Sequence, residues 1–403
     1  MIRNIAFLMI DVQDLSGAGG AERFFFDFLN RNNSDDNRMF NIYLLTNNST
    51  NLSNVSYNAI NPNYLHVFEL YRNKWLKGVT DKLGIVGNLF SFLREMITFI
   101  PLYRFCYKTK IEILHIPLYE KKDYFLIYLF DKFSFLKRPK ISFSIVDCRI
   151  PYRYFSNDSA HYYSSHLSYE KAFNTIRIDG VLSWYKLFEE FNKTHSLIKS
   201  DPKVYSVTSR YSIIDEMDCW DSKKNVIVFA GRLDDQKDPE FFVKAVEKVI
   251  RNGKDANYQF FIYGKGPLKD RIQKYINENG LAEKIKMDYN PKMKAVFLTS
   301  KAFVSTQLYE NFPSMSMAEA MACENVIIAK NVGQTDYFVK NNENGFLVDE
   351  NNLDDLAEKI SEFISLDEQQ KRVMGKYSAS LLRNVHNFKN FQAQFNNYVL
   401  SLL

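Results

Sequence analysis

Two basic side chains follow an apolar run in the second half of the chain. Residues 226–230 read as a buried strand, and Arg232 and Lys237 come directly after it. Asp238 and Pro239 then make a good N-cap and first residue for a helix. An arginine and a lysine beside the N–H groups of a helix start can bind a diphosphate. The spacing alone leaves open the alternative that both are solvated surface charges.

A second polar pair lies further along, with Glu310 in a loop and Glu319 in a helix expected over 314–323. Carboxylates at the edge of a sheet can accept hydrogen bonds from the vicinal hydroxyls of a ribose or a sugar. A helix charge and a capping charge would explain the same two residues. The pair is therefore a hypothesis for a sugar site.

The elements around these residues alternate between strand and helix. After the boundary that we place near Asp218, apolar runs at 226–230, 259–263, 302–306 and 326–329 predict strands, and helical patterns separate them. The first half predicts strands at 5–10, 41–45, 111–116, 141–146 and 204–208. This alternation predicts parallel, doubly wound sheets, which bind ligands at the carboxyl ends of their strands. We expect the active site in the cleft between two such domains.

Composition and charge narrow the class of protein. A chain of 403 residues is too long for one ordinary hydrophobic core, so we expect two domains. A net charge of +5 is mild for this length and does not by itself indicate nucleic-acid binding. The stretch 71–140 mixes basic and aromatic residues, which suits an anionic membrane surface; a solvated basic face over ordinary helices explains it as well. The N-terminus does not read as a signal peptide. The longest apolar stretch, residues 83–102, carries charges at its centre, so we do not expect it to span a bilayer unaided. We expect a cytoplasmic protein, with contact to the inner membrane face as a further hypothesis.

The motifs of the second half, in this order, resemble the group 1 glycosyltransferases, which form glycosyltransferase family four. The matching segments are 226–237, 264–267, 310–313, 319–323, 327–329, 333–336 and 344–348. The resemblance implies the GT-B fold: two facing Rossmann-like, doubly wound parallel-sheet domains with an interdomain cleft and C-terminal helices. We assign residues 1–218 to an acceptor domain and 219–385 to a nucleotide-sugar donor domain. Residues 386–403 are expected to form a helix that packs back on the first domain.

The resemblance also implies a reaction and its residues. It implies a retaining, metal-independent hexosyltransferase-type enzyme, without a cofactor, that uses a UDP- or GDP-linked sugar. Arg232 and Lys237 would hold the diphosphate, Glu319 the ribose hydroxyls, and Glu310 would approach the donor sugar, with backbone N–H groups after it cradling sugar and phosphate. Further donor-binding positions implied in this way are Gly19, Gly20, Gly231, Gly264, Asn311, Phe312, Pro313 and Ser314.

Several positions depart from the family pattern. Eight residues separate Glu310 from Glu319 where seven are usual, so either the loop has one extra residue or Glu310 is not the equivalent acid. Glu324 stands where glycine is usual. In the first half, residues 17–20 resemble the family's first glycine loop. A dinucleotide-binding loop is a poor alternative, because no acidic residue follows the second predicted strand to bind a ribose. Val146 replaces a usual histidine.

On the acceptor side the candidates are Glu22 and Asp147, and a capping role is the alternative for Asp147. The expected function is sugar transfer to a glycan hydroxyl, including a lipid-linked saccharide, in the synthesis of cell-surface polysaccharide or lipopolysaccharide. Two alternatives stay open at this point. One is a GT-B sugar-nucleotide epimerase, and the other is a non-catalytic scaffold that binds a sugar nucleotide.

Overall fold

The computed structural model of the chain describes residues 2–10, 20–47, 61–68, 84–119, 123–133, 137–146, 163–290, 292–312 and 314–403. It divides into two compact units. The first comprises Met1–Val207 together with Gln392–Leu403, and the second comprises Thr208–Phe391. The division after Val207 precedes the boundary proposed near Asp218.

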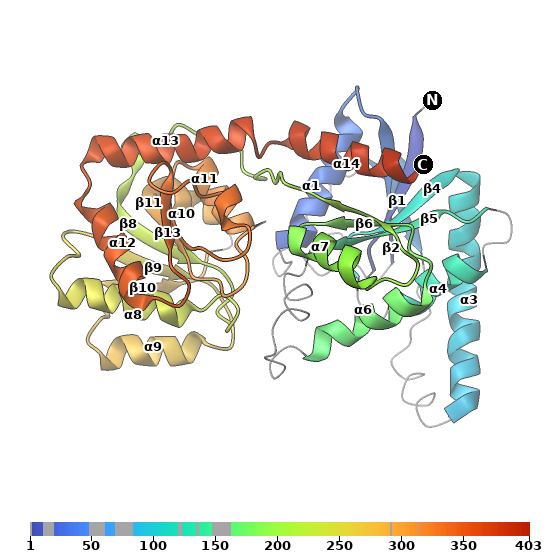
Figure 1. Cartoon of the computed structure of the whole chain (residues 1–403), viewed down its shortest axis with the longest axis horizontal. Coiled ribbons are helices and arrows are strands. Elements are labelled where there is room, and N and C mark those ends of the chain that lie inside the picture. Colours follow the sequence, from blue (N-terminus) through green and yellow to red (C-terminus); the bar gives the residue numbers. More distant parts are fainter. Residues whose placement is uncertain are drawn as a thin grey trace. The chain divides into compact units, whose positions relative to one another are not determined.

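The first unit is built on a seven-stranded parallel sheet in the order β3-β2-β1-β4-β5-β6-β7 (Figure 1). Its strands are β1 (Arg3–Leu8), β2 (Phe40–Asn47), β3 (Leu65–Phe68), β4 (Ile111–Ile116), β5 (Lys140–Ile145), β6 (Gly180–Ser183) and β7 (Lys203–Ser206). Its helices are α1 (Gly20–Ser34), α3 (Gly84–Lys108), α4 (Tyr124–Lys132), α6 (Tyr163–Thr175) and α7 (Lys186–His195). The four-residue strands β3 and β6 were not predicted, whereas the equally short β7 coincides with the strand expected at 204–208.

The last helix, α14 (Phe388–Leu402), completes the core of this unit. Its Phe395 ring lies 5.9 Å from Phe7 of β1 and 4.9 Å from Phe28 of α1. The hydroxyl of Tyr398 hydrogen-bonds Ser142 on β5. Gly180 permits this approach, since a Cβ there would lie 2.6 Å from Leu402. The end of the chain thus packs on the sheet formed by its beginning.

The second unit holds a six-stranded parallel sheet in the order β10-β9-β8-β11-β12-β13. Its strands are β8 (Lys224–Ala230), β9 (Gln259–Tyr263), β10 (Ile285–Asp288), β11 (Ser300–Ser305), β12 (Val326–Lys330) and β13 (Gly345–Val348). Its helices are α8 (Pro239–Arg251), α9 (Lys269–Glu278), α10 (Met293–Thr299), α11 (Met315–Ala322), α12 (Leu353–Ser365) and α13 (Glu368–Asn384). Figure 1 shows α8, α9 and α12 on one face of the sheet, with α10, α11 and α13 on the other.

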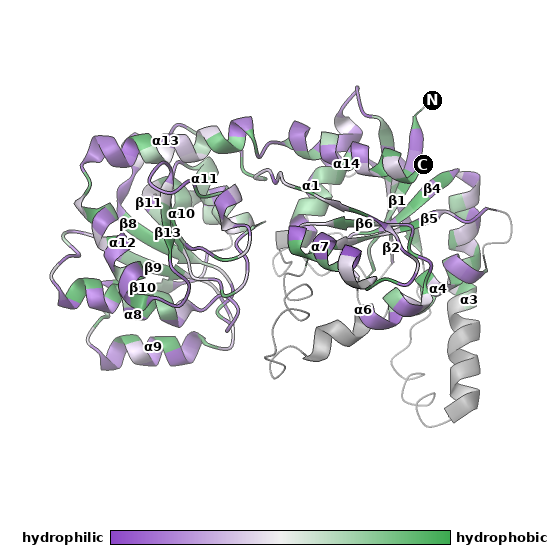
Figure 2. Ribbon diagram, viewed as in Figure 1, coloured by the Kyte–Doolittle hydropathy of each residue, from purple (hydrophilic) through white to green (hydrophobic). Residues whose placement is uncertain are grey.

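Local signals explain why α8 forms where it was predicted. The Asp238 carboxylate accepts from the N–H of Phe241, and Pro239 occupies the first turn. Gly253, at a φ of +65°, follows the end of the helix. The strands that α8 covers are predominantly hydrophobic, as Figure 2 shows.

Each sheet has the doubly wound order 3-2-1-4-5-6 over its first six strands, when strands are counted within the unit. In the second unit the order reverses between β8 and β11, which pair directly. Ligands of such folds bind beyond the carboxyl ends of the strands at this reversal. Within the described ranges, no helix is both long and apolar enough to cross a bilayer.

Candidate active site

Three loops meet at the carboxyl edge of the second sheet. They follow β8 (231–238), β11 (306–314) and β12 (331–334). Leu308 N–H donates to the carbonyl of Gln236 at 3.1 Å, which joins the first two loops. Gln334 N–H donates to the Glu310 carboxylate at 2.7 Å, which joins the second and third. The edge is therefore one hydrogen-bonded surface.

The two predicted cations lie differently in the loop after β8. Lys237 donates through Nζ to Oε1 of Gln307 at 2.6 Å, a neutral acceptor at the end of β11. Arg232 is 66% exposed and lies 3.3 Å from the carboxylate of Asp234. Lys237 is thus held at the edge between the strands, whereas Arg232 lies on the surface in an ion pair.

Side chains that follow β11 and end β12 hold the backbone around Lys237 in place. The Thr306 hydroxyl bonds the carbonyls of Lys237 at 2.9 Å and Asp238 at 2.8 Å. The amine of Lys330, at the end of β12, is fully buried and lies 3.0 Å from the Asp238 carboxylate. It also lies 3.7 Å from the ring centroid of Phe241. A buried cation that is paired and stacked in this way fixes the start of α8.

Glu310 occupies an enclosed cradle. Its Oε1 accepts from the N–H groups of Phe312 at 3.0 Å and Gln334 at 2.7 Å. The pKa of this carboxyl is raised to about 8, mainly by burial and to a smaller degree by the charge of Asp336, while the backbone N–H donors lower it. A carboxyl with this pKa holds its proton at neutral pH, so it can donate a hydrogen bond as well as accept one.

Gly333 closes the cradle. A Cβ at this position would lie 2.2 Å from Oε2 of Glu310, and the residue has a φ of +56°. Both the contact and the backbone conformation require glycine.

The residues after Glu310 serve the loop itself. Asn311 accepts from the Ser305 hydroxyl at 2.6 Å and donates to the carbonyl of Lys330 at 2.8 Å. Phe312 is buried, with its ring 5.1 Å from Tyr337. The N–H of Phe312 is used by Glu310, and that of Ser314 by the Asn311 carbonyl at 2.7 Å. These two N–H groups are therefore not available to cradle a sugar as the loop stands.

Ser314 is the N-cap of α11, since its hydroxyl accepts from the N–H of Met317 at 3.4 Å. Glu319 lies within this helix and is only 3% exposed. Its predicted contact with ribose hydroxyls stays a prediction.

Glu324, where glycine is usual, ends α11. It has a φ of +53°, and Asn325 N–H donates to the carbonyl of Ala320 at 3.0 Å, as in a Schellman motif. The side chain of Glu324 accepts from the N–H of Cys219 at 3.1 Å, which offsets part of the cost of the left-handed backbone. The motif explains the usual glycine without any role in chemistry.

Of the predicted donor-site glycines Gly231 and Gly264, only Gly264 is required by packing. A Cβ on Gly264 would lie 2.0 Å from the carbonyl oxygen of Gly231, so glycine is needed where the loops after β8 and β9 cross. A Cβ on Gly231 would meet Lys237 at an ordinary 3.7 Å. The donor role of both glycines stays a prediction.

Several other predicted residues lie outside the described ranges, namely Gly19, Asp147 and Pro313. Gly20 begins α1, and Glu22 lies in its first turn. Near the position where Val146 replaces the usual histidine, β4 carries a different one. His115 is buried between the Ser142 and Ser144 hydroxyls at 2.8 and 2.9 Å, and burial lowers its pKa to about 3. It is a neutral core residue.

Sequence reasoning missed Gln307, Lys330 and the cradle function of Gly333 and Gln334. A lysine at the end of the apolar run of β12 was a usable signal, because a charge in such a position needs a partner. Gln307 offered no signal, since its contact with Lys237 is made across 70 residues of sequence.

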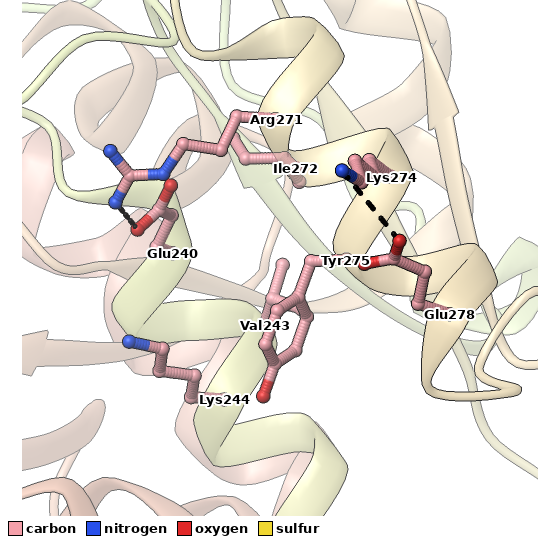
Figure 3. Close-up of a pocket in the computed structure, with 8 residues that line it drawn as sticks. All are labelled: Glu240, Val243, Lys244, Arg271, Ile272, Lys274, Tyr275 and Glu278. Carbon is pink, nitrogen blue, oxygen red and sulfur yellow. Dashed lines mark hydrogen bonds and ion pairs between the residues drawn. The ribbon is translucent and has the colours of Figure 1, made fainter.

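A separate hollow of about 300 Å³ lies between α8 and α9, away from the loop residues described above (Figure 3). Figure 3 shows Glu240 paired with Arg271, and Lys274 paired with Glu278, around Val243 and Ile272. The charges at this hollow therefore largely pair with each other. In the part of the chain that the structure describes, no three His, Cys, Asp or Glu side chains gather closely enough to hold a metal ion.

Comparison with known proteins assigns the second half of the chain to a family. Residues 215–380 match the family described as "Glycosyl transferases group 1". The second unit is a group 1 glycosyltransferase domain. A poly(ribitol-phosphate) alpha-N-acetylglucosaminyltransferase of Staphylococcus aureus is 29% identical over 147 residues, which are 36% of this chain and 29% of that protein. A D-inositol 3-phosphate glycosyltransferase of Paenarthrobacter aurescens is 28% identical over 159 residues, which are 38% of each chain. The match spans well under two thirds of either relative.

Solved structures extend the likeness to both units of this chain. Sucrose-phosphate synthase of Thermosynechococcus elongatus superimposes with a TM-score of 0.71 over 99% of each chain, at 14% identity. The lipopolysaccharide outer core galactosyltransferase WaaB gives a TM-score of 0.64 over 99% of this chain and 100% of its own, at 17% identity. The chain has the GT-B fold, and the glycosyltransferase domain is its second half.

Proposed function

We propose that the chain is a retaining glycosyltransferase that moves a hexose-type sugar from a nucleotide diphosphate to a glycan hydroxyl. The observation that carries the proposal is the joined edge of the second sheet, where Lys237 and the cradled Glu310 lie on loops tied together through Gln307 and Gln334. Lys237 and Arg232 supply positive charge at the start of α8, where a diphosphate binds. Glu310 lies on the neighbouring loop, where the sugar attached to that diphosphate would extend.

The chemistry required of these residues is stabilisation of a leaving group. The bond from the anomeric carbon to the diphosphate breaks, and the acceptor oxygen forms its bond on the same face. The departing diphosphate oxygen is the nearest base for the acceptor proton. Two cations and a helix N-terminus offset the charge that develops on the diphosphate, so the proposed reaction requires no metal ion.

Relatives support a UDP-linked donor and a lipid-linked acceptor. One match is named UDP-Gal:alpha-D-GlcNAc-diphosphoundecaprenol alpha-1,3-galactosyltransferase, from Escherichia coli, at 29% identity over 33% of this chain and 35% of its own. HepE of Anabaena, with a TM-score of 0.65 at 15% identity over 100% of each chain, was solved with UDP and glucose. We propose the same chemical classes here, in cell-surface polysaccharide or lipopolysaccharide synthesis at the cytoplasmic face of the membrane.

The test measures donor affinity and nucleotide release with UDP- and GDP-sugars. Lys237→Ala and Arg232→Ala should each weaken donor binding by about 10- to 100-fold, the range of a lost charge-assisted hydrogen bond. Lys274→Ala is the matched control, because this lysine is 73% exposed on α9. Wild-type affinity in both loop variants would overturn the assignment.

The product distinguishes the remaining candidates. Transfer releases free nucleotide in step with a new glycoside. An epimerase would change the sugar while the nucleotide stays attached, and a scaffold would bind the donor without turnover.

A further inference from the structure

One face of α3 in the first unit presents large apolar side chains to solvent. Ile97 is 54% exposed, Ile100 56% and Tyr107 49%. Pro101, Arg104 and Lys108 are exposed beside them. These positions fall at intervals of three and four residues, so they share one side of the helix.

The opposite side of α3 is buried, which fixes the orientation of the exposed one. Phe99 lies 5.1 Å from Phe130 of α4, and Leu102 and Cys106 are buried with it. Figure 1 shows α3 next to α4 at the margin of the first unit, and Figure 2 shows this end of α3 in both hydrophobic and hydrophilic colours. The outward face is not part of the core of this unit.

The charge on this face has one sign. Between residues 97 and 108 there is no Asp or Glu, and Arg104 and Lys108 are the only Arg and Lys. Neither has an ion-pair partner among the described residues. From Ile97 to Lys108 the helix advances about 16 Å, at the usual rise of about 1.5 Å per residue. Isoleucines, a tyrosine and two cations side by side along such a length offer both apolar and phosphate-binding contacts to the headgroup region of a bilayer.

We propose that the face formed by Ile97, Ile100, Pro101, Arg104, Tyr107 and Lys108 docks on the surface of an anionic lipid bilayer. The isoleucines and the tyrosine enter the boundary between headgroups and acyl chains, while Arg104 and Lys108 bind lipid phosphates. The uncompensated positive charge selects a bilayer over an apolar protein surface as the occupant. The inference rests on the proposed function only in its purpose, which is to bring the enzyme to a lipid-linked acceptor.

The experiment is flotation of the full chain with vesicles of phosphatidylcholine alone or with 30% phosphatidylglycerol, at about 50 and 500 mM NaCl, a range over which salt screening increases strongly. The wild type should float with the anionic vesicles at low salt and largely detach at high salt. Arg104→Glu/Lys108→Glu should lower the partition coefficient by at least about 25-fold, or about fivefold for each lost cation. Ile97→Glu/Ile100→Glu should abolish binding.

Matched controls place the same changes elsewhere on exposed helices. Val373→Glu alters an aliphatic side chain that is 57% exposed on α13, and Lys274→Glu alters a cation on α9. Both should float like the wild type. Because all the variant side chains point outward, thermal unfolding should be unchanged, which separates lost docking from lost folding.

Three results would overturn the docking surface. They are failure of the wild type to float at low salt, flotation that the α3 variants leave intact, and a concentration-dependent dimer that Ile97→Glu/Ile100→Glu dissociates without any vesicle binding. Donor hydrolysis without lipid, measured in parallel, tests the proposed function separately. An enzyme that floats but never releases nucleotide would refute that function and leave the docking surface standing.

Discussion

Gly333→Ala is the substitution that tests the Glu310 cradle most directly. The added methyl would lie 2.2 Å from Oε2 of Glu310, so the carboxyl must move. Movement breaks the hydrogen bonds from Phe312 and Gln334 that orient it. The left-handed backbone adds about 1 kcal/mol for alanine, and the forced displacement adds about 1–3 kcal/mol.

A matched control separates these two contributions. Gly280 has nearly the same conformation, with a φ of +67°, but its Cβ would meet nothing within 4 Å. Gly280→Ala therefore measures the backbone cost alone. For a domain of this size, 1 kcal/mol shifts the thermal midpoint by about 2–4 °C, so we expect a fall of about 3 °C for Gly280→Ala and about 9 °C for Gly333→Ala.

The assay is calorimetry of the full chain, which can resolve the transition of the second unit, together with donor turnover. Gly333→Ala should lose donor turnover, while Gly280→Ala keeps it. In a Glu310→Ala background the obstructing carboxyl is gone, so Gly333→Ala should then cost no more than Gly280→Ala. Equal thermal shifts for the two glycine variants in the natural background would refute the cradle.

Two further predictions concern buried charges. Because the folded state raises the pKa of Glu310 from 4.5 to about 8, the folded protein binds this proton more tightly than the unfolded chain does, and stability should fall as pH rises between these values. Glu310→Gln should remove that part of the slope in urea midpoints measured from pH 5 to 9; an unchanged slope would contradict the shift. Lys330→Met should cost about 3 kcal/mol, because it strands the Asp238 carboxylate beside a buried site. Lys330→Met/Asp238→Asn should recover most of this loss, since asparagine still caps α8; a double variant no more stable than the single one would show that the pair is not what holds the loop.

Helix α8 shows how far local sequence reaches. Asp238, Pro239, a regular apolar face and Gly253 specify its start, its buried side and its end through contacts within a few residues. The longer strands, such as β4 and β9, were predicted at their observed bounds from apolar runs alone. The four-residue strands β3 and β10 were not, because their pairing partners rather than their own composition make them strands.

At the site, local sequence predicts Arg232 and Lys237 only in part. Their types and their spacing before a helix cap are properties of the sequence, and so are the ordered motifs that resemble the glycosyltransferase family. Only the tertiary structure places Lys237 against Gln307, leaves Arg232 on the surface and closes Gly333 over Glu310. Each of these depends on loops that follow different strands and meet because the parallel sheet aligns their carboxyl ends, and no local pattern encodes which side chains face one another across that edge.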